Sequence, residues 1–501
     1  MEYKNIIFRR SAIVFVFLLF SAFLGYLFRI LLARHLSISD YGLFYSMLSF
    51  FTFILVFVEL GMTNALIRRI VEAITHKKEE EIKLIIISSL FFQMLITSCI
   101  SLFIFLFADA LSASFFHSSH SFELRLMTFW FWTLPFFYFF TWLYHSFQRS
   151  TWFAFLETSK ALLSLAFLLL FFFFGSGIEA PFLSYAVVNI ALVILFCFTI
   201  KRLLPLFFKT PFTLDFVSVK LVLQQGLFMG FSGFGWMILT QMDTLMLTYF
   251  RGLDEVGLYQ VAVPLTSLVL SFATAITTTV LYPIVTELWV KKKRDELQSL
   301  FSLIYKYLVL IIFPFAFTVA LFSQELILIF FGGKYLVAVI IVQVLALGSI
   351  FSIFSFINNS ILNAMGSYKR VALFSFVACA VNFILNLLMI PRYGAVGAAA
   401  VTVLSYLLMF FFAMFEIKKM TGFEPFYKPF CFCIIASFSF VIFLILFKAL
   451  LPLSGILLLI STCAAASFCY LLALHFSHLL RFSEVKELIE KSGFNLNSKK
   501  L

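Results

Sequence analysis

The sequence predicts an all-α integral membrane protein with about fourteen transmembrane helices, in two pseudo-symmetric six-helix lobes plus two C-terminal helices. Composition, the length of the apolar runs and the distribution of basic residues predict it. The 501 residues are 63% hydrophobic and 12% charged, with a mean hydropathy of +1.08. Soluble domains are about 45–50% apolar and about 25% charged. This composition excludes a soluble enzyme, a disordered chain and a secreted disulfide scaffold.

The apolar runs are continuous and long enough for helices that cross a bilayer, each of which needs about 20 mostly apolar residues. Read at that length, the chain contains fourteen such runs. They are residues 12–33, 41–63, 84–107, 124–145, 154–174, 181–200, 221–249, 257–281, 301–322, 337–358, 371–390, 394–415, 430–447 and 453–474.

The basic residues test this count independently, because cytoplasmic loops of membrane proteins carry an excess of Lys and Arg. With the N-terminus in the cytoplasm and the runs alternating, 27 of the 36 Lys and Arg residues lie on the cytoplasmic side and 6 outside. Three lie inside the runs: Arg29, Lys160 and Lys306. We therefore expect a multi-pass protein of the inner (cytoplasmic) membrane with both termini cytoplasmic. The net charge of +12 reflects this topology, and no nucleic-acid partner is expected.

The first and second halves resemble each other when their residue numbers differ by a constant 215, without a gap from residue 40 to residue 116. Matching segments are Asp40-Tyr41-Gly42-Leu43-Phe44 with Glu255-Val256-Gly257-Leu258-Tyr259, Lys77-Lys78 with Lys292-Lys293, and Phe115-Phe116 with Phe330-Phe331. The shift spans six helices, so both copies start on the same side of the membrane. Transporters with such parallel repeats bind substrate between the two halves and alternate access by rocking.

The repeat divides the chain into five parts. We expect an N-lobe at 1–205, a cytoplasmic linker at 206–220, a C-lobe at 221–416, two further helices within 427–476, and a cytoplasmic tail at 481–501.

Fourteen helices, the six-helix repeat and the segments LLARHLSISDYGLF, EVGLYQVAVPL and ILNAMGSYK resemble the polysaccharide flippases, Wzx-like, of the multidrug/oligosaccharidyl-lipid/polysaccharide exporter (MOP) superfamily. The resemblance implies a flippase that moves a polyprenyl-diphosphate-linked oligosaccharide from the inner to the outer leaflet by alternating access, for cell-surface polysaccharide biosynthesis. Membrane lipid, and glycosyltransferases or a polymerase of the same pathway, are the other partners expected.

Four alternatives stay open. A lipid II-type flippase and a drug/cation antiporter belong to the same superfamily, and a membrane glycosyltransferase or polymerase belongs to another class. The fourth is a scaffold with no transport activity. No enzymatic activity and no cofactor or metal are expected. Gly332-Gly333-Lys334 is followed by Tyr335, so the glycine-rich phosphate loop of an ATPase is not formed there.

The resemblance implies a polar cleft between the lobes, lined by the first, second, seventh and eighth helices. Arg29 in the first helix is a candidate for contact with a diphosphate or sugar, because a planar guanidinium suits phosphate. Snorkelling of Arg29 to the headgroups is the alternative. Asp243 in the seventh helix is a candidate to pair with Arg29, to bind a coupling cation or to take up a proton.

Three further charges are weaker candidates for the cleft. Glu59 near the inner end of the second helix either gates the cleft, carries a proton, or forms a salt bridge to Arg68 or Arg69. Lys160 either faces the cleft or pairs with Glu157, three residues before it on the same helix face. Lys306 in the ninth helix is likewise a candidate to face the cleft, because buried charges in membranes tend to be functional.

Gly226, Gly230, Gly233 and Gly235 lie in the seventh helix. Gly226 and Gly230 have the spacing that allows two membrane helices to approach closely, and the run from Gly230 to Gly235 is a candidate hinge.

Overall fold

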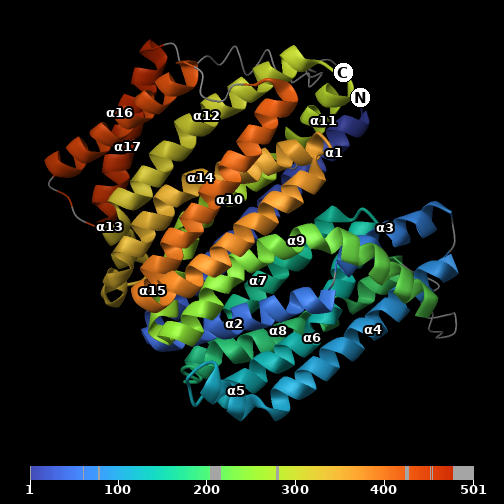
Figure 1. Ribbon diagram of the computed structural model, residues 1–501. Helices are drawn as coiled ribbons and strands as arrows, with labels where there is room; N and C mark the ends of the chain where they lie inside the picture. The colour runs from blue at the N-terminus through green and yellow to red at the C-terminus, as the bar shows by residue number, and fades with distance from the viewer. Residues whose placement is uncertain are drawn as a thin grey trace. The chain divides into compact units, whose positions relative to one another are not determined.

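The structure is a computed structural model that describes residues 2–59, 61–76, 79–203, 216–277, 281–423, 428–451, 453 and 455–477. Every regular element within these ranges is a helix (Figure 1). The helices form two compact units, Met1–Gln260 and Val261–Leu501. Residues 206–215 of the predicted linker and the whole predicted tail, 481–501, lie outside the described residues.

The first unit is built around α6. Its elements are α1 (Glu2–His35), α2 (Ile38–Glu59), α3 (Met62–Thr75), α4 (Glu79–Leu106), α5 (Ala108–Ser114), α6 (Ser121–Ser146), α7 (Ser150–Phe173), α8 (Glu179–Leu203), α9 (Phe216–Arg251) and the beginning of α10 (Leu253–Ile276). α6 packs between α4 and α8, and α7 packs against α1 (Figure 1). Trp142 and Phe140 of α6 are almost completely buried in the resulting core.

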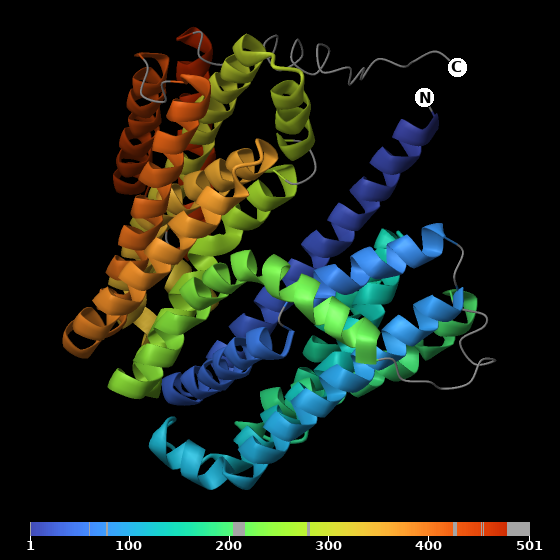
Figure 2. The same cartoon turned by 45° about the vertical axis from the view of Figure 1, so that its right-hand side comes forward.

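The second unit contains the rest of α10 and the helices that follow it. These are α11 (Tyr282–Val290), α12 (Arg294–Leu321), α13 (Ser323–Phe330), the 3-10 helix η2 (Gly333–Ala338), α14 (Val339–Ala364), α15 (Tyr368–Thr421), α16 (Lys428–Leu450) and α17 (Gly455–Phe476). α14 packs along α15, and α16 lies between α12 and α17 (Figure 2).

The helix boundaries reproduce the sequence repeat. The same shift of 215 relates both ends of α4 to those of α12. After η2 the shift becomes 218: it separates both ends of α6 and α14, the starts of α7 and α15, and the ends of α8 and α15. The second copy therefore repeats the helices of the first with a short insertion.

Among the described residues, eleven helices are long and apolar enough to cross a membrane. One of them, α15, has 54 residues and is divided at Gly394, whose backbone is not helical (φ 56°, ψ −138°). It therefore contains two predicted spans, 371–390 and 394–415. The predicted spans 221–249 and 257–281 fall on α9 and α10, parts of whose side chains are not described. The total of fourteen stays a prediction.

The sequence analysis missed four short helices, α3, α5, α11 and α13. α3 is amphipathic: Met62, Ala65, Leu66 and Ile70 are fully buried, whereas the side chain of Arg68 is 63% exposed. Such a helix covers the core with one side and meets water or headgroups with the other. A search for runs of about 20 apolar residues does not detect it.

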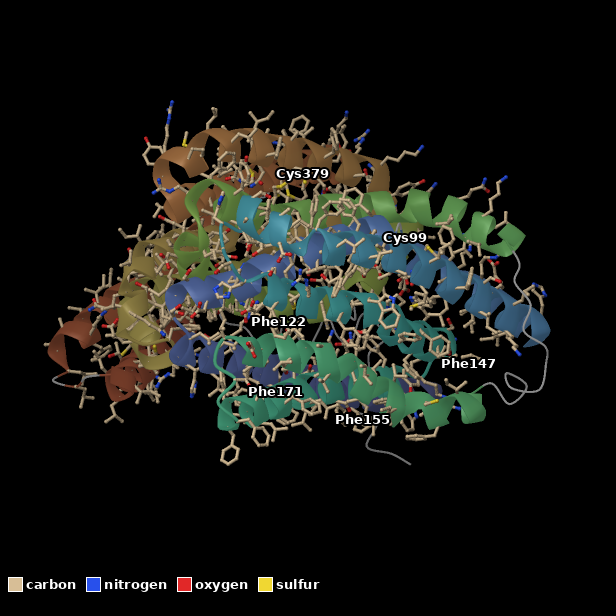
Figure 3. All side chains as sticks on the ribbon, turned by 90° about the horizontal axis from the view of Figure 1, so that it is seen from below. Cys99, Phe122, Phe147, Phe155, Phe171 and Cys379 are labelled. Carbon is tan, nitrogen blue, oxygen red and sulfur yellow. The ribbon has the colours of Figure 1, made fainter. Side chains whose placement is uncertain are left out.

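Large apolar side chains cover much of the outer surface. On α7, Phe155 is 43% and Phe173 is 84% exposed, and Figure 3 shows Phe155 and Phe171 on this helix and Cys99 on α4. Exposed apolar surface of this extent would be unstable in water and is typical of helices in contact with lipid. The protein is a multi-pass membrane protein.

Candidate functional site

Arg29 lies half-buried on α1 of the first unit. Its Nη1 atom donates to the backbone carbonyl and to the side-chain Oε1 atom of Gln260, both at 3.5 Å. The Nε2 atom of Gln260 donates in turn to Oγ1 of Thr244 at 2.8 Å. Side chains of α1, α9 and α10 therefore meet at Gln260, which is 7% exposed.

The guanidinium of Arg29 lies over a tyrosine ring, and further aromatic residues lie close to it. Its Cζ atom lies 4.3 Å from the ring centroid of Tyr45, within the range of a cation–π interaction. The Tyr41 ring lies 4.8 Å from that of Tyr45, and its hydroxyl donates to the Gln260 carbonyl at 3.4 Å. Tyr185 of α8 packs on Phe28, the neighbour of Arg29 on α1, at 5.6 Å, and on Trp130 at 5.5 Å. The arrangement is a cation that lies over one tyrosine ring and donates to two neutral acceptors.

Asp243 is adjacent to this group in sequence. It precedes Thr244 on α9, is 2% exposed, and accepts a hydrogen bond from the Tyr259 hydroxyl at 2.8 Å. The described contacts of Arg29 are with Gln260 and the ring of Tyr45. Its predicted ion pair with Asp243 is not among them.

Glu59 and Lys160 lie elsewhere in the first unit. The Glu59 carboxylate, at the end of α2, accepts a hydrogen bond from Thr63 at 3.1 Å. The Nζ atom of Lys160 lies 4.2 Å from the ring centroid of Phe137 on α6. The ion pair with Glu157 that the helix spacing suggested is not among the described ion pairs.

Lys306 lies on α12 of the second unit, with its Nζ atom 5.5 Å from the ring centroid of Tyr307. The four glycines lie in α9. Gly226 is buried, but the surroundings of Gly230, Gly233 and Gly235 are outside the description. Within the described ranges, no group of three or more His, Cys, Asp or Glu side chains is placed to hold a metal ion.

The sequence analysis missed Gln260, Tyr45 and Tyr185. Aromatic residues make up 20% of the chain, so composition could not select two of them. Gln260 could have been found, because it precedes Pro264 by four residues in a predicted helix. Proline has no N–H, so the backbone carbonyl of Gln260 lacks its helical donor and can accept a hydrogen bond from another side chain. Chemically, the described group offers a positive charge, aromatic faces and weakly held neutral partners, which together suit an anionic ligand.

Solved transporter structures share this fold. The lipid II flippase MurJ, in an inward closed conformation, is 16% identical to this chain with a TM-score of 0.75. The match covers 93% of this chain and 99% of the MurJ chain. An inward-facing multidrug-resistance MATE transporter is 12% identical, covers 80% and 96%, and has a TM-score of 0.65. A MOP superfamily transporter from Pyrococcus furiosus is 13% identical, covers 82% and 95%, and has a TM-score of 0.53. The fold, together with the family matches below, defines a flippase-type transporter of the MOP superfamily.

Family models and relatives narrow this class. Residues 7–289 match the model described as polysaccharide biosynthesis protein, so the chain belongs to that family. Residues 229–388 also match the MatE model. An uncharacterized membrane protein of Methanocaldococcus jannaschii is 26% identical over 93% of this chain and 95% of its own. A probable low-salt glycan biosynthesis flippase, Agl15, of Haloferax volcanii is 24% identical over 45% of this chain and 48% of its own.

Proposed function

We propose that this protein is a flippase that moves a polyprenyl-diphosphate-linked oligosaccharide from the inner to the outer leaflet by alternating access, for cell-surface polysaccharide biosynthesis. The observation that carries the proposal is the guanidinium of Arg29, which lies in a spanning helix among tyrosine rings. A diphosphate needs a cation in an otherwise apolar environment, and the only partners described for this one are neutral.

The physical argument rests on the cost of the charge. An arginine at the centre of a spanning helix costs about 2.5–3.5 kcal/mol on insertion scales, and charged residues within spanning helices usually line substrate pathways. Arg29 lies within two turns of the end of the span Ile13–His35, so its cost is smaller than this. A cation–π contact and two long bonds to neutral acceptors offset part of this cost. A phosphate would offset more, because charge-assisted hydrogen bonds are roughly twice as strong as neutral ones.

The family match and the similarity to the probable glycan biosynthesis flippase of Haloferax also support a lipid-linked glycan as substrate. We place the protein in the cytoplasmic membrane with both termini inside, because the basic residues divide in that way. A small tag at either terminus should then react with an impermeant label only after the cell is permeabilised.

Two alternative functions have specific support. Residues 229–388 match the MatE model, which favours drug/cation antiport, and the MurJ fold likeness favours a lipid II-type substrate. Assays with each candidate substrate separate these functions.

The test is translocation in proteoliposomes that contain a fluorescent polyprenyl-diphosphate oligosaccharide, read by an impermeant quencher. Wild type should expose the inner-leaflet label, and Arg29→Gln should slow exposure about tenfold or more, as expected for the loss of a charged hydrogen bond. The matched control is Arg34→Gln, the same change at an exposed arginine of the same helix, which should stay close to wild type. Equal rates with and without protein would overturn the proposal, and a drug-dependent cation flux in their place would establish the antiporter.

A further inference from the structure

The backbone carbonyl of Gln260 is an acceptor that Pro264 creates. Pro264 lies inside α10. In an α-helix the carbonyl of each residue accepts the N–H four residues later, and proline has no N–H. The carbonyl that loses its helical donor is therefore that of Gln260. Two side chains replace the donor: Nη1 of Arg29 at 3.5 Å and the Tyr41 hydroxyl at 3.4 Å.

The second unit shows the same arrangement independently. Pro314 lies inside α12, so the carbonyl of Leu310 loses its helical donor. The Tyr470 hydroxyl donates to that carbonyl at 3.2 Å. In both helices a side-chain donor occupies the carbonyl that a proline has freed, and at Gln260 one of the donors is charged.

The repeat shows that this acceptor differs between the two copies. The shift of 215 also relates the starts of α2 and α10, and continued to the helix before each it pairs Arg29 with Thr244. The Gln260 side chain contacts both of them. The counterpart of Gln260 is Tyr45, whose ring lies at 4.3 Å from the guanidinium. The counterpart of Pro264 is Ser49, which has an N–H for its helix. The Gln260 carbonyl in the second copy therefore lacks a helical donor and can accept from Arg29. The carbonyl of Tyr45, at the matching position of the first copy, keeps the N–H of Ser49 as its helical donor.

The contacts between Arg29 and Gln260 are easily exchanged. Both are 3.5 Å long, whereas N–H···O bonds are typically about 2.7–3.2 Å. Both acceptors are also neutral. A phosphate oxygen would make shorter, charge-assisted bonds to the same donors.

We infer that Gln260 is a positioning residue: its proline-freed carbonyl and its amide oxygen hold the Arg29 guanidinium until a phosphate oxygen of an isoprenoid diphosphate replaces them. The inference rests on the proposed function, because it assumes that Arg29 binds the anionic part of the substrate. It adds that the phosphate must displace the backbone carbonyl and the amide oxygen of Gln260 from the guanidinium.

The experiment measures binding of farnesyl diphosphate to the purified full chain in nanodiscs by calorimetry, with farnesol as the uncharged control. Gln260→Glu puts a competing negative charge beside Arg29 and should weaken diphosphate binding about tenfold. Pro264→Ala restores the helical donor and should tighten binding about two- to threefold. Pro314→Ala, the same change at a freed carbonyl of the second unit, should leave binding unchanged.

An Arg29→Gln background separates positioning from other effects. If Gln260 acts through Arg29, adding Gln260→Glu to Arg29→Gln should not weaken binding further. Wild-type binding by Gln260→Glu alone, or an equal loss in both backgrounds, would overturn the inference while leaving the flippase proposal intact. Unchanged binding in Arg29→Gln alone would instead reject the site on which the proposed function rests. Should Pro264→Ala fail to fold, the Gln260→Glu comparison decides the question by itself.

Discussion

Gly42 and Gly257 make the same close contact from the two copies of the repeat. A Cβ atom on Gly42 would lie 1.9 Å from the carbonyl oxygen of Leu253, and one on Gly257 would lie 2.3 Å from that of Ile38. Ile38 and Leu253 are themselves equivalent in the repeat, as the first residues of α2 and α10. The beginnings of these two helices therefore meet around a local pseudo-two-fold axis, and each glycine admits the backbone of the other helix.

Gly42→Ala and Gly257→Ala should each destabilise this packing by about 1–3 kcal/mol, because the obstacle is a backbone atom that cannot rotate away. The apparent melting temperature in detergent would measure the change. Gly25→Ala is the matched control, since no neighbouring atom lies within 4 Å of the place that its Cβ atom would take, and it should be neutral or slightly stabilising. Melting temperatures that fall equally for all three variants would contradict the close-contact explanation.

Tyr470→Phe removes the donor from the Leu310 carbonyl and should destabilise the second unit by about 0.6–2 kcal/mol, the range found for hydrogen bonds within membranes. In a Pro314→Ala background the alanine N–H supplies the helical donor, so the same change should cost less. A double-mutant cycle on apparent melting temperatures measures this coupling. Additive effects would show that the hydroxyl does not substitute for the missing N–H.

Lys448 attaches α16 to the end of α12. Its Nζ atom donates to the carbonyl of Leu321 at 2.7 Å and lies 2.8 Å from the Glu325 carboxylate. Lys448→Met should destabilise this attachment by about 1 kcal/mol, a modest value because both side chains are partly exposed. Faster hydrogen exchange at the end of α16 would reveal the loss, whereas exchange there should not change in Lys369→Met, at an exposed lysine.

Gly394 turns the chain between the two halves of α15 with φ 56° and ψ −138°, a conformation that residues with a Cβ atom rarely adopt. Gly394→Ala should therefore cost about 1–3 kcal/mol, seen as a lower apparent melting temperature. Val396→Ala, two residues away at a partly exposed side chain, should change it much less. If Gly394→Ala melted like wild type, the turn would not require glycine.

The fold class could be predicted from the sequence because the membrane imposes it. Long apolar runs, the division of basic residues and a constant repeat shift do not depend on side-chain packing. The short helices could not be found in this way. α3 has only 14 residues, and apolar residues on one side of a short helix form a less distinct sequence pattern than one long apolar run.

The candidate site was only partly accessible to sequence reasoning. A charge in an apolar run is conspicuous, so Arg29 was selected, but its partner Gln260 is neutral and distant in sequence. Helix spacing suggested Glu157 as the partner of Lys160, whereas the structure places the ring of Phe137 there. Spacing along one helix predicts which side chains share a face, but it does not predict what a neighbouring helix brings to that face.

The equivalence of Arg29 and Thr244 has an evolutionary consequence. An ancestral homodimer with identical subunits would have placed two arginines, or two threonines, in these positions around its symmetry axis. Two arginines would carry two positive charges in the same site, and two threonines would carry none. A single cation at this pair of positions therefore requires both copies to lie in one chain and to differ there, as Arg29 and Thr244 do.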